Sequence, residues 1–296
     1  MSNQIVAEPT GQWTLSEQQI ADLLSVPHFK NSREARKNLS ALYASYAFGF
    51  ADLIGAYLSD AEPRVVADIG TGYGWLAAAL AHRTKAHIIA VDNDAARLAA
   101  ARQIATILGV AERIEWRLGG LPHLPLADGE ADVTFCVEVL EHVGTDAEMV
   151  VDLGRVTRDA LVITTPNRLF PCIQHDTRLP FCHCLPLPMR NRYAALFGRL
   201  NRQDSNLFWS PGMLLGALPE FRRVSALLQY PDAQHFRETE RRMDQALDGP
   251  VTWQRLLRRQ FFTAVSWLGP YAIYALPNLA STFRRIDISA APPSCA

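Results

Sequence analysis

A regular alternation of apolar runs and helical segments between residues 64 and 165 constrains the fold more than any other feature of the chain. Apolar runs of strand length occupy residues 64–69, 86–91, 114–118, 131–137 and 160–165. Helical patterns separate them at 73–83, 94–108 and 146–157. Strands that alternate with helices of about 10 to 15 residues form a parallel sheet covered on both faces. The sequence therefore predicts an α/β, doubly wound, mostly parallel sheet.

The flanking segments complete this organisation. Residues 15–57 have apolar residues at helical spacing, interrupted by Pro27, which predicts two or three N-terminal helices. Residues 221–228 and 279–286 read as further strands, which gives a seven-stranded, Rossmann-like sheet. Residues 167–210 are too long for a simple connection and are expected to be an inserted substrate cap. We expect a helical cap at 1–60, a cofactor-binding core at 61–167, and the insertion, remaining strands and an apolar C-terminal segment at 168–296.

The composition narrows the class of partner. The chain has 29 basic and 30 acidic side chains and is 49% hydrophobic, which is typical of a globular protein and not of a disordered one. A net charge of −1 gives no general attraction to nucleic acid, so a small molecule is the expected partner. The sequence indicates no particular oligomeric state. Five cysteines and no recognisable signal segment favour a reducing cytoplasm.

A glycine loop follows the first strand. Gly70, Gly72 and Gly74 lie between the apolar run 64–69 and the next helix, where glycine lets the backbone approach a ligand closely. A dinucleotide fingerprint needs glycine at the sixth position, where this chain has Trp75. An NAD-dependent oxidoreductase is therefore disfavoured.

Two carboxylates flank this loop. Asp68 ends the first strand and Asp92 ends the second. They would repel a pyrophosphate but suit a cationic ammonium group and a ribose diol. Together with the segments 124–129 and 131–133, these residues resemble the class I S-adenosylmethionine-dependent methyltransferases, over about residues 64–167.

The resemblance implies a site for S-adenosylmethionine. Asp68 would face its methionine end, the three glycines would form the floor, and Asp92 would bind both ribose hydroxyls. Gly120 stands where many relatives have an acid that reads adenine, so backbone groups or another side chain would replace that contact. The implied cofactor-binding residues are Asp68, Gly70, Gly72, Gly74, Asp92, Asn93, Gly120, Leu121 and Glu138.

An acid-histidine cluster follows the fourth strand. One helical turn would bring Glu138, Glu141 and His142 to a common side, next to the cofactor. His142 is then a candidate general base, and a structural, helix-orienting role is the alternative. The pattern also resembles the metal ligands of ubiquinone-pathway O-methyltransferases and of the plant small-RNA methyltransferase. A divalent metal ion, with His175 or His183 as a further ligand, is a third and less favoured interpretation.

The predicted insertion is rich in histidine and cysteine. His175, with Asp176 and Arg178, forms a polar cluster that is either at the pocket mouth or on a solvated loop, and His175 is the second candidate base. Cys182, His183 and Cys184 are spaced too tightly for one tetrahedral zinc ion, which favours unreactive cysteines.

The last apolar stretch, residues 261–282, has no charged side chain. We expect a helix and a final strand that close the pocket, with contact to a membrane surface as the alternative. Either arrangement suggests an apolar acceptor. The function expected from the sequence is therefore O-methylation of a hydroxylated, hydrophobic small molecule. The alternatives are N- or C-methylation, and a protein that binds S-adenosylmethionine without catalysis.

Overall fold

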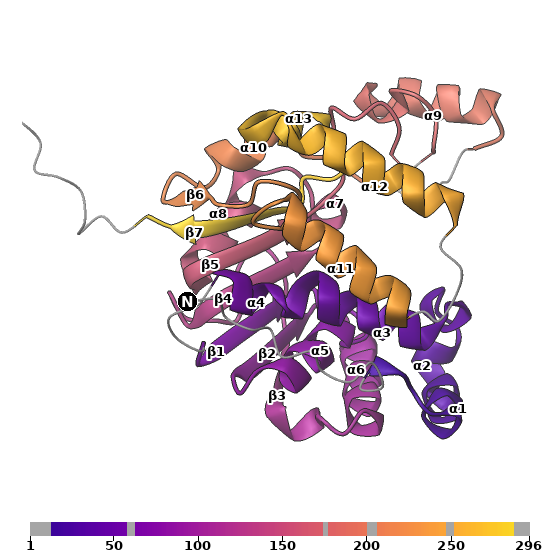
Figure 1. The fold of residues 1–296 in the computed structure, drawn as a ribbon, viewed down its shortest axis with the longest axis vertical. Helices are drawn as coiled ribbons and strands as arrows, with labels where there is room; N and C mark the ends of the chain where they lie inside the picture. The colour runs from indigo at the N-terminus through magenta and orange to yellow at the C-terminus, as the bar shows by residue number, and fades with distance from the viewer. Residues whose placement is uncertain (1–12, 58–62, 174–176, 200–205, 247–251, 287–296) are drawn as a thin grey trace, which may run out of the picture.

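The computed structural model contains a seven-stranded sheet with helices on both faces (Figure 1). The structure describes residues 13–57, 63–173, 177–199, 206–246 and 252–286. The strand order is β3-β2-β1-β4-β5-β7-β6. Its strands are β1 (Val65–Ile69), β2 (His87–Asp92), β3 (Ile114–Leu118), β4 (Ala131–Val137), β5 (Thr157–Thr164), β6 (Phe221–Arg223) and β7 (Ser281–Arg285). Pairs among β1 to β5 are parallel, and β7 is antiparallel to β5 and β6. The predicted fold class is confirmed.

One strand is much shorter than predicted. The apolar pattern predicts a strand over 221–228, but β6 ends at Arg223. The N–H groups of Val224 and Ser225 both donate to the carbonyl of Thr282, at 2.9 and 3.4 Å, and the chain then turns away from the sheet. Leu227 is fully buried in this turn. The apolar residues after Arg223 therefore serve packing and not strand pairing.

The strands divide the core into two hydrophobic clusters. Successive side chains of a strand point to opposite faces, so Val66 joins one cluster while Ala67 and Ile69 join the other. The helices α5 (Trp75–Arg83) and α6 (Ala95–Ile107) cover the first face. The second face packs against α8 (Ala147–Val156) and α10 (Pro211–Gly216). Burial on both faces explains why the strands read as nearly continuous apolar runs.

The N-terminal helices pack against α5 and α6. They are α1 (Glu17–Ser25), α2 (Pro27–Lys30), α3 (Leu39–Tyr46) and α4 (Leu53–Tyr57), with a 3-10 turn, η2 (Glu34–Arg36), and a π-helical turn, η3 (Ala47–Ala51). The four α-helices exceed the two or three predicted, because Val26 leaves the helical conformation before Pro27 begins a new helix. By length and composition, Leu39–Tyr57 is the one run among the described residues that could cross a membrane, and 50% of its apolar window is buried inside the fold.

The region after β5 supplies most of the remaining helices. The insertion contains η5 (Cys182–Cys184) and α9 (Leu187–Leu196), and after β6 come α11 (Ala233–Ala246), α12 (Trp253–Ser266), η6 (Gly269–Tyr271) and α13 (Ala272–Ala275). The chain bends at Gly269 (φ 55°), so the apolar stretch 261–282 is not one continuous helix.

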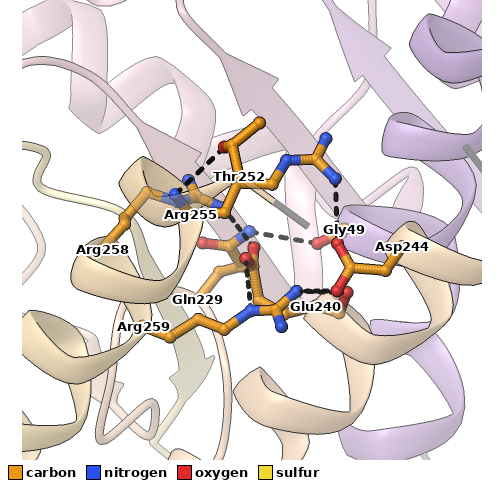
Figure 2. Close-up of polar contacts among 8 residues, drawn as sticks. All are labelled: Gly49, Gln229, Glu240, Asp244, Thr252, Arg255, Arg258 and Arg259. Carbon is orange, nitrogen blue, oxygen red and sulfur yellow. Dashed lines mark hydrogen bonds and ion pairs between the residues drawn. The ribbon is translucent and has the colours of Figure 1, made fainter. Parts of the chain in front are cut away.

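An ion-pair network holds α12 against α11 (Figure 2). Arg255 pairs with Asp244 at 2.9 Å, and Arg259 pairs with Asp244 and with Glu240 at 3.4 Å. Arg258 also pairs with Glu240. The arginines of α12 therefore face α11. The opposite side of α12 points away from α11.

Candidate functional site

The carboxyl ends of β1, β2 and β4 open on a cavity of about 370 Å³. It lies where the strand order reverses between β1 and β4, the position at which doubly wound sheets bind ligands. Among the residues implied by the resemblance, those that line it are Gly70, Asp92, Asn93, Gly120, Leu121 and Glu138, and His142 joins them. Residues from four segments that are separate in the sequence therefore line one cavity.

The glycine loop between β1 and α5 requires glycine. Gly70, Gly72 and Gly74 have φ values of 71°, 60° and 77°, in the left-handed region. A Cβ on Gly70 would lie 2.3 Å from Cγ2 of Val139, and one on Gly74 would lie 3.1 Å from the Trp116 ring. A side chain at Gly70 would collide with Val139 at the cavity wall, and one at Gly74 would press on the Trp116 ring.

Asp92 is held at the end of β2 by the loop itself. The backbone N–H of Gly72 donates to Oδ2 at 2.9 Å, and that of Asp94 donates to Oδ1 at 3.0 Å. The guanidinium of Arg97 lies 3.4 Å from the same carboxylate. Its Nη1 donates to Oδ1 at 3.4 Å and to Oδ2 at 3.5 Å, so a ligand hydroxyl would compete with these two long hydrogen bonds for Asp92. Arg97 also lines the cavity and was not predicted from the sequence.

Asp68 is buried beneath the loop. The hydroxyl of Thr71 donates to its Oδ2 at 2.6 Å. Burial raises the pKa of Asp68 to about 7, and the charge of Asp92 adds to the rise, whereas hydrogen bonds from Thr71 and from the backbone of Ala77 oppose it. Asp68 does not itself line the cavity. A positive charge nearby would lower its pKa and favour the ionised carboxylate.

The acid-histidine cluster differs from the predicted helical turn. Glu138 has φ 56°, and α7 (Leu140–Val143) begins only two residues later. The predicted uninterrupted helical turn is therefore wrong. Glu141 is buried and His142 is exposed, while Glu138 and His142 both line the cavity. The left-handed conformation is unusual for a residue other than glycine and is often found at functional sites. The ring Nδ1 of His142 lies 3.1 Å from Oδ1 of Asn206, in the segment that ends the insertion.

Glu138 and Glu141 nevertheless remain neighbours. The hydroxyl of Thr165 donates to Glu141 at 3.0 Å, and that of Thr164 donates to Glu138 at 3.1 Å. Burial, followed by the charge of Glu138, raises the pKa of Glu141 to about 8. Glu141 therefore carries a proton at neutral pH and hydrogen-bonds Glu138.

The N-terminal helices bring two further polar groups that the sequence did not predict as site residues. Glu34 in η2 accepts a hydrogen bond from Nε1 of Trp75 at 3.0 Å, and burial raises its pKa. Burial also raises the pKa of Tyr46, helped by the charges of Glu34, Asp68 and Glu138. Neither Tyr46 nor Glu34 lines the 370 Å³ cavity, so both act on the site through charge and packing behind it. Nothing in local spacing marks Glu34 or Tyr46, because both reach the site through the tertiary fold.

The histidines and cysteines of the insertion are not gathered at this cavity. His175 lies outside the described residues, as does Asp176. His183 is buried, with Nε2 2.8 Å from the carbonyl of Arg168, and does not line the cavity. Cys182 is buried and Cys184 is exposed. Within the described ranges, no group of three or more His, Cys, Asp or Glu side chains is arranged to hold a metal ion.

The apolar C-terminal stretch has the predicted element types but a different position. It contains the end of α12, then α13, then β7. None of the residues 261–282 lines the 370 Å³ cavity. The stretch packs instead at the end of β5, where Nδ2 of Asn167 donates to the carbonyls of Ile273 and Leu276. Its closure of a substrate pocket stays a prediction.

Comparison with known proteins agrees with this geometry. The model of a methyltransferase domain matches residues 66–160. A "Probable S-adenosylmethionine-dependent methyltransferase" of Mycolicibacterium smegmatis is 33% identical over 121 residues, 40% of this chain and 44% of that protein. A ubiquinone biosynthesis O-methyltransferase of Hahella chejuensis is 34% identical over 106 residues, 35% of this chain and 43% of that protein.

A solved structure extends the likeness to the whole fold. Geranyl diphosphate C-methyltransferase from Streptomyces coelicolor A3(2) has a TM-score of 0.50 and 16% identity, covering 90% of this chain and 84% of that one. At this identity the likeness concerns the fold alone. The chain spans less than half the length of the two curated relatives, so the similarity in sequence is confined to the core. Residues 66–160 thus match a methyltransferase domain, and the relatives that share this core are named as methyltransferases, one of them S-adenosylmethionine-dependent.

Proposed function

We propose that the protein transfers the methyl group of S-adenosylmethionine to a hydroxyl oxygen of a hydrophobic small molecule. The observation that carries the proposal is the cavity between a glycine loop and buried carboxylates. The acids at the ends of β1 and β2, Asp68 and Asp92, are 2% and 3% exposed. A ligand with both a cationic end and a ribose diol satisfies both, whereas a pyrophosphate would be repelled.

The residues of the cavity have distinct tasks in this proposal. Asp92 accepts the ribose hydroxyls, and Gly70 leaves room beside Val139. Asp68, which is buried beneath the loop and does not line the cavity, attracts the ammonium group from there. S-adenosylmethionine supplies a methyl group that is already activated by its sulfonium. The protein therefore contributes mainly alignment of the acceptor and exclusion of water. The similarity to a ubiquinone biosynthesis O-methyltransferase supports oxygen as the acceptor atom.

His142 is the proposed acceptor of the hydroxyl proton. It lines the cavity, and Asn206 holds one ring nitrogen. Glu138 lies in the same cavity, and its protonated neighbour Glu141 stabilises the negative charge of Glu138. The presence of His142 and Glu138 in one cavity supports their proposed roles beside the acceptor.

The first test of the proposal is the pH dependence of cofactor binding. Because the pKa of Asp68 is raised to about 7, this carboxyl is largely protonated at pH 6 and must lose its proton to pair with an ammonium group. Affinity should therefore rise with pH and be about eightfold lower at pH 6 than at pH 7.5. Isothermal titration calorimetry in two buffers of different ionisation enthalpy should also detect release of about half a proton per ligand at pH 7.

The control for this experiment is Asp68→Asn. The variant should bind more weakly at every pH, and its affinity should vary little between pH 6 and pH 7.5. Equal affinity of the unmodified protein at both values, together with no dependence on the buffer, would contradict the role of Asp68.

The second test measures transfer itself. With isotopically labelled cofactor and a set of hydrophobic phenols and alcohols, mass spectrometry should find the label on acceptor oxygen. His142→Gln should lower kcat about tenfold and leave the affinity for S-adenosylmethionine unchanged, since loss of the proton is secondary to transfer from an activated sulfonium. Label on nitrogen or carbon would replace O-methylation with the corresponding alternative. Binding without transfer to any acceptor would favour a non-catalytic protein.

A further inference from the structure

The two sides of α12 differ in an unusual way. Phe262 and Val265 are buried, and Arg255 and Arg259 face α11 in the ion-pair network (Figure 2). The solvent side, in contrast, carries large apolar residues. We call these the α12 stripe: Trp253, Leu256, Leu257, Phe261, Trp267 and Leu268, all exposed, with Trp253 at 67% and Trp267 at 84%.

The stripe is continuous. At 100° per residue its members project within an arc of about 140°. Only Ala264 and Gln260 share that arc. Soluble proteins rarely expose a contiguous apolar surface of this kind unless it meets a partner. The following turn and α13 extend the surface with the exposed rings of Tyr271 and Tyr274.

The insertion contributes a similar surface. Exposed apolar side chains on and just after α9 include Leu187, Met189, Leu196 and Phe197. In Figure 1, α9, α12 and α13 all lie toward the same end of the molecule. Two segments that are far apart in sequence therefore present apolar side chains at one end of the fold.

Both segments are rich in arginine, which favours an anionic partner. Residues 252–286 contain five arginines and no aspartate or glutamate, and residues 177–199 contain four arginines and no acid. The whole chain, in contrast, has a net charge of −1. An apolar stripe with aromatic rings and basic neighbours matches the interface of a bilayer that contains anionic lipids.

We propose that the α12 stripe, with the exposed apolar residues of α9, docks the protein on the surface of an anionic membrane. The helix lies in the plane of the interface: its 14 residues are about 21 Å long, short of the roughly 30 Å hydrocarbon core. A second copy of the chain fits less well, because α11 and α12 together carry six arginines against three acids, and opposed stripes would bring these like net charges together. The proposal does not depend on methyl transfer.

Sedimentation with vesicles tests this docking. The full chain should bind vesicles of phosphatidylcholine mixed with phosphatidylglycerol more strongly than vesicles of phosphatidylcholine alone. The double substitution Leu257→Glu and Trp267→Glu should reduce the partition coefficient about tenfold or more. The matched control is Val151→Glu, which adds a charge at an exposed apolar residue of α8 and should leave vesicle binding unchanged. Circular dichroism and calorimetric titration with S-adenosylmethionine verify that each variant is folded.

Tryptophan fluorescence gives a readout specific to the stripe. Trp13, Trp75 and Trp209 are buried and Trp116 is half-buried, so Trp253 and Trp267 are the exposed tryptophans of the described chain. Vesicles whose lipids have brominated acyl chains should quench the tryptophan fluorescence of the unmodified protein. Replacing both residues with phenylalanine should remove this quenching while most of the sedimentation with vesicles remains.

Three outcomes would overturn the proposal. The first is no binding to either kind of vesicle. The second is binding that the glutamate substitutions leave unchanged, which would place the contact elsewhere. The third is absence of vesicle binding together with a dimer, seen by analytical ultracentrifugation, that the same substitutions dissociate. That result would assign the stripe to self-association.

Discussion

Replacing Asp92 with alanine is expected to weaken the binding of S-adenosylmethionine about a thousandfold, measured by isothermal titration calorimetry. The carboxylate is buried at the end of β2 and lines the cavity. Two hydrogen bonds from ribose hydroxyls to a charged acceptor contribute about 1.5 to 3 kcal/mol each, and about 4 kcal/mol corresponds to a thousandfold change in Kd. The substitution also removes the acceptor for the N–H of Gly72, which loosens the loop.

Asp94→Asn is the matched control. Asp94 is a neighbouring carboxylate that caps α6 by accepting from the N–H groups of Ala96 and Arg97, and it does not line the cavity. Its substitution should change Kd by no more than about twofold, because asparagine is an equivalent cap. The unmodified protein should also prefer adenosine over 2′-deoxyadenosine, and Asp92→Ala should lose this preference. A preference that persists in the variant would show that another group reads the ribose.

The substitution Gly70→Ala is expected to lower the free energy of unfolding by about 3 kcal/mol. Left-handed backbone at a residue with a Cβ costs about 1 to 2 kcal/mol, and overpacking adds about 1 to 3 kcal/mol. Both apply here, because Gly70 has φ 71° and its Cβ would lie 2.3 Å from Val139. Urea unfolding, followed by circular dichroism, measures the change.

Two variants separate these contributions. Gly72 also has a positive φ, of 60°, but a Cβ there meets nothing within 4 Å, so Gly72→Ala should cost only the backbone component. Adding Val139→Ala to Gly70→Ala removes the collision and should recover part of the loss. If Gly70→Ala proved no more destabilising than Gly72→Ala, the close packing of the loop against Val139 would be refuted.

The parallel core could be predicted from the sequence because its signals are local. Strands buried on both faces, such as β4, read as apolar runs, and the glycine loop marks the start of α5. The strand predicted over 221–228 could not be limited to β6, because Leu227 is as apolar as a strand residue although it is buried in a turn. Burial, not strand pairing, determines its residue type.

Some residues at and behind the site could be predicted from local sequence signals, and others could not. Asp68 and Asp92 could be predicted because each ends a strand beside the loop. Glu34 and Tyr46 could not, since they reach the site through packing of the N-terminal helices on α5. The left-handed conformation of Glu138 also escaped prediction, because spacing alone suggests an uninterrupted helical turn.

The position of β7 has a consequence for biosynthesis. The strand follows β6 in the chain, yet it separates β5 from β6. When β6 leaves the ribosome, it has no neighbour to which it can hydrogen-bond, and the edge of β5 is still bare. The sheet can therefore be completed only after Ser281–Arg285 has been synthesised.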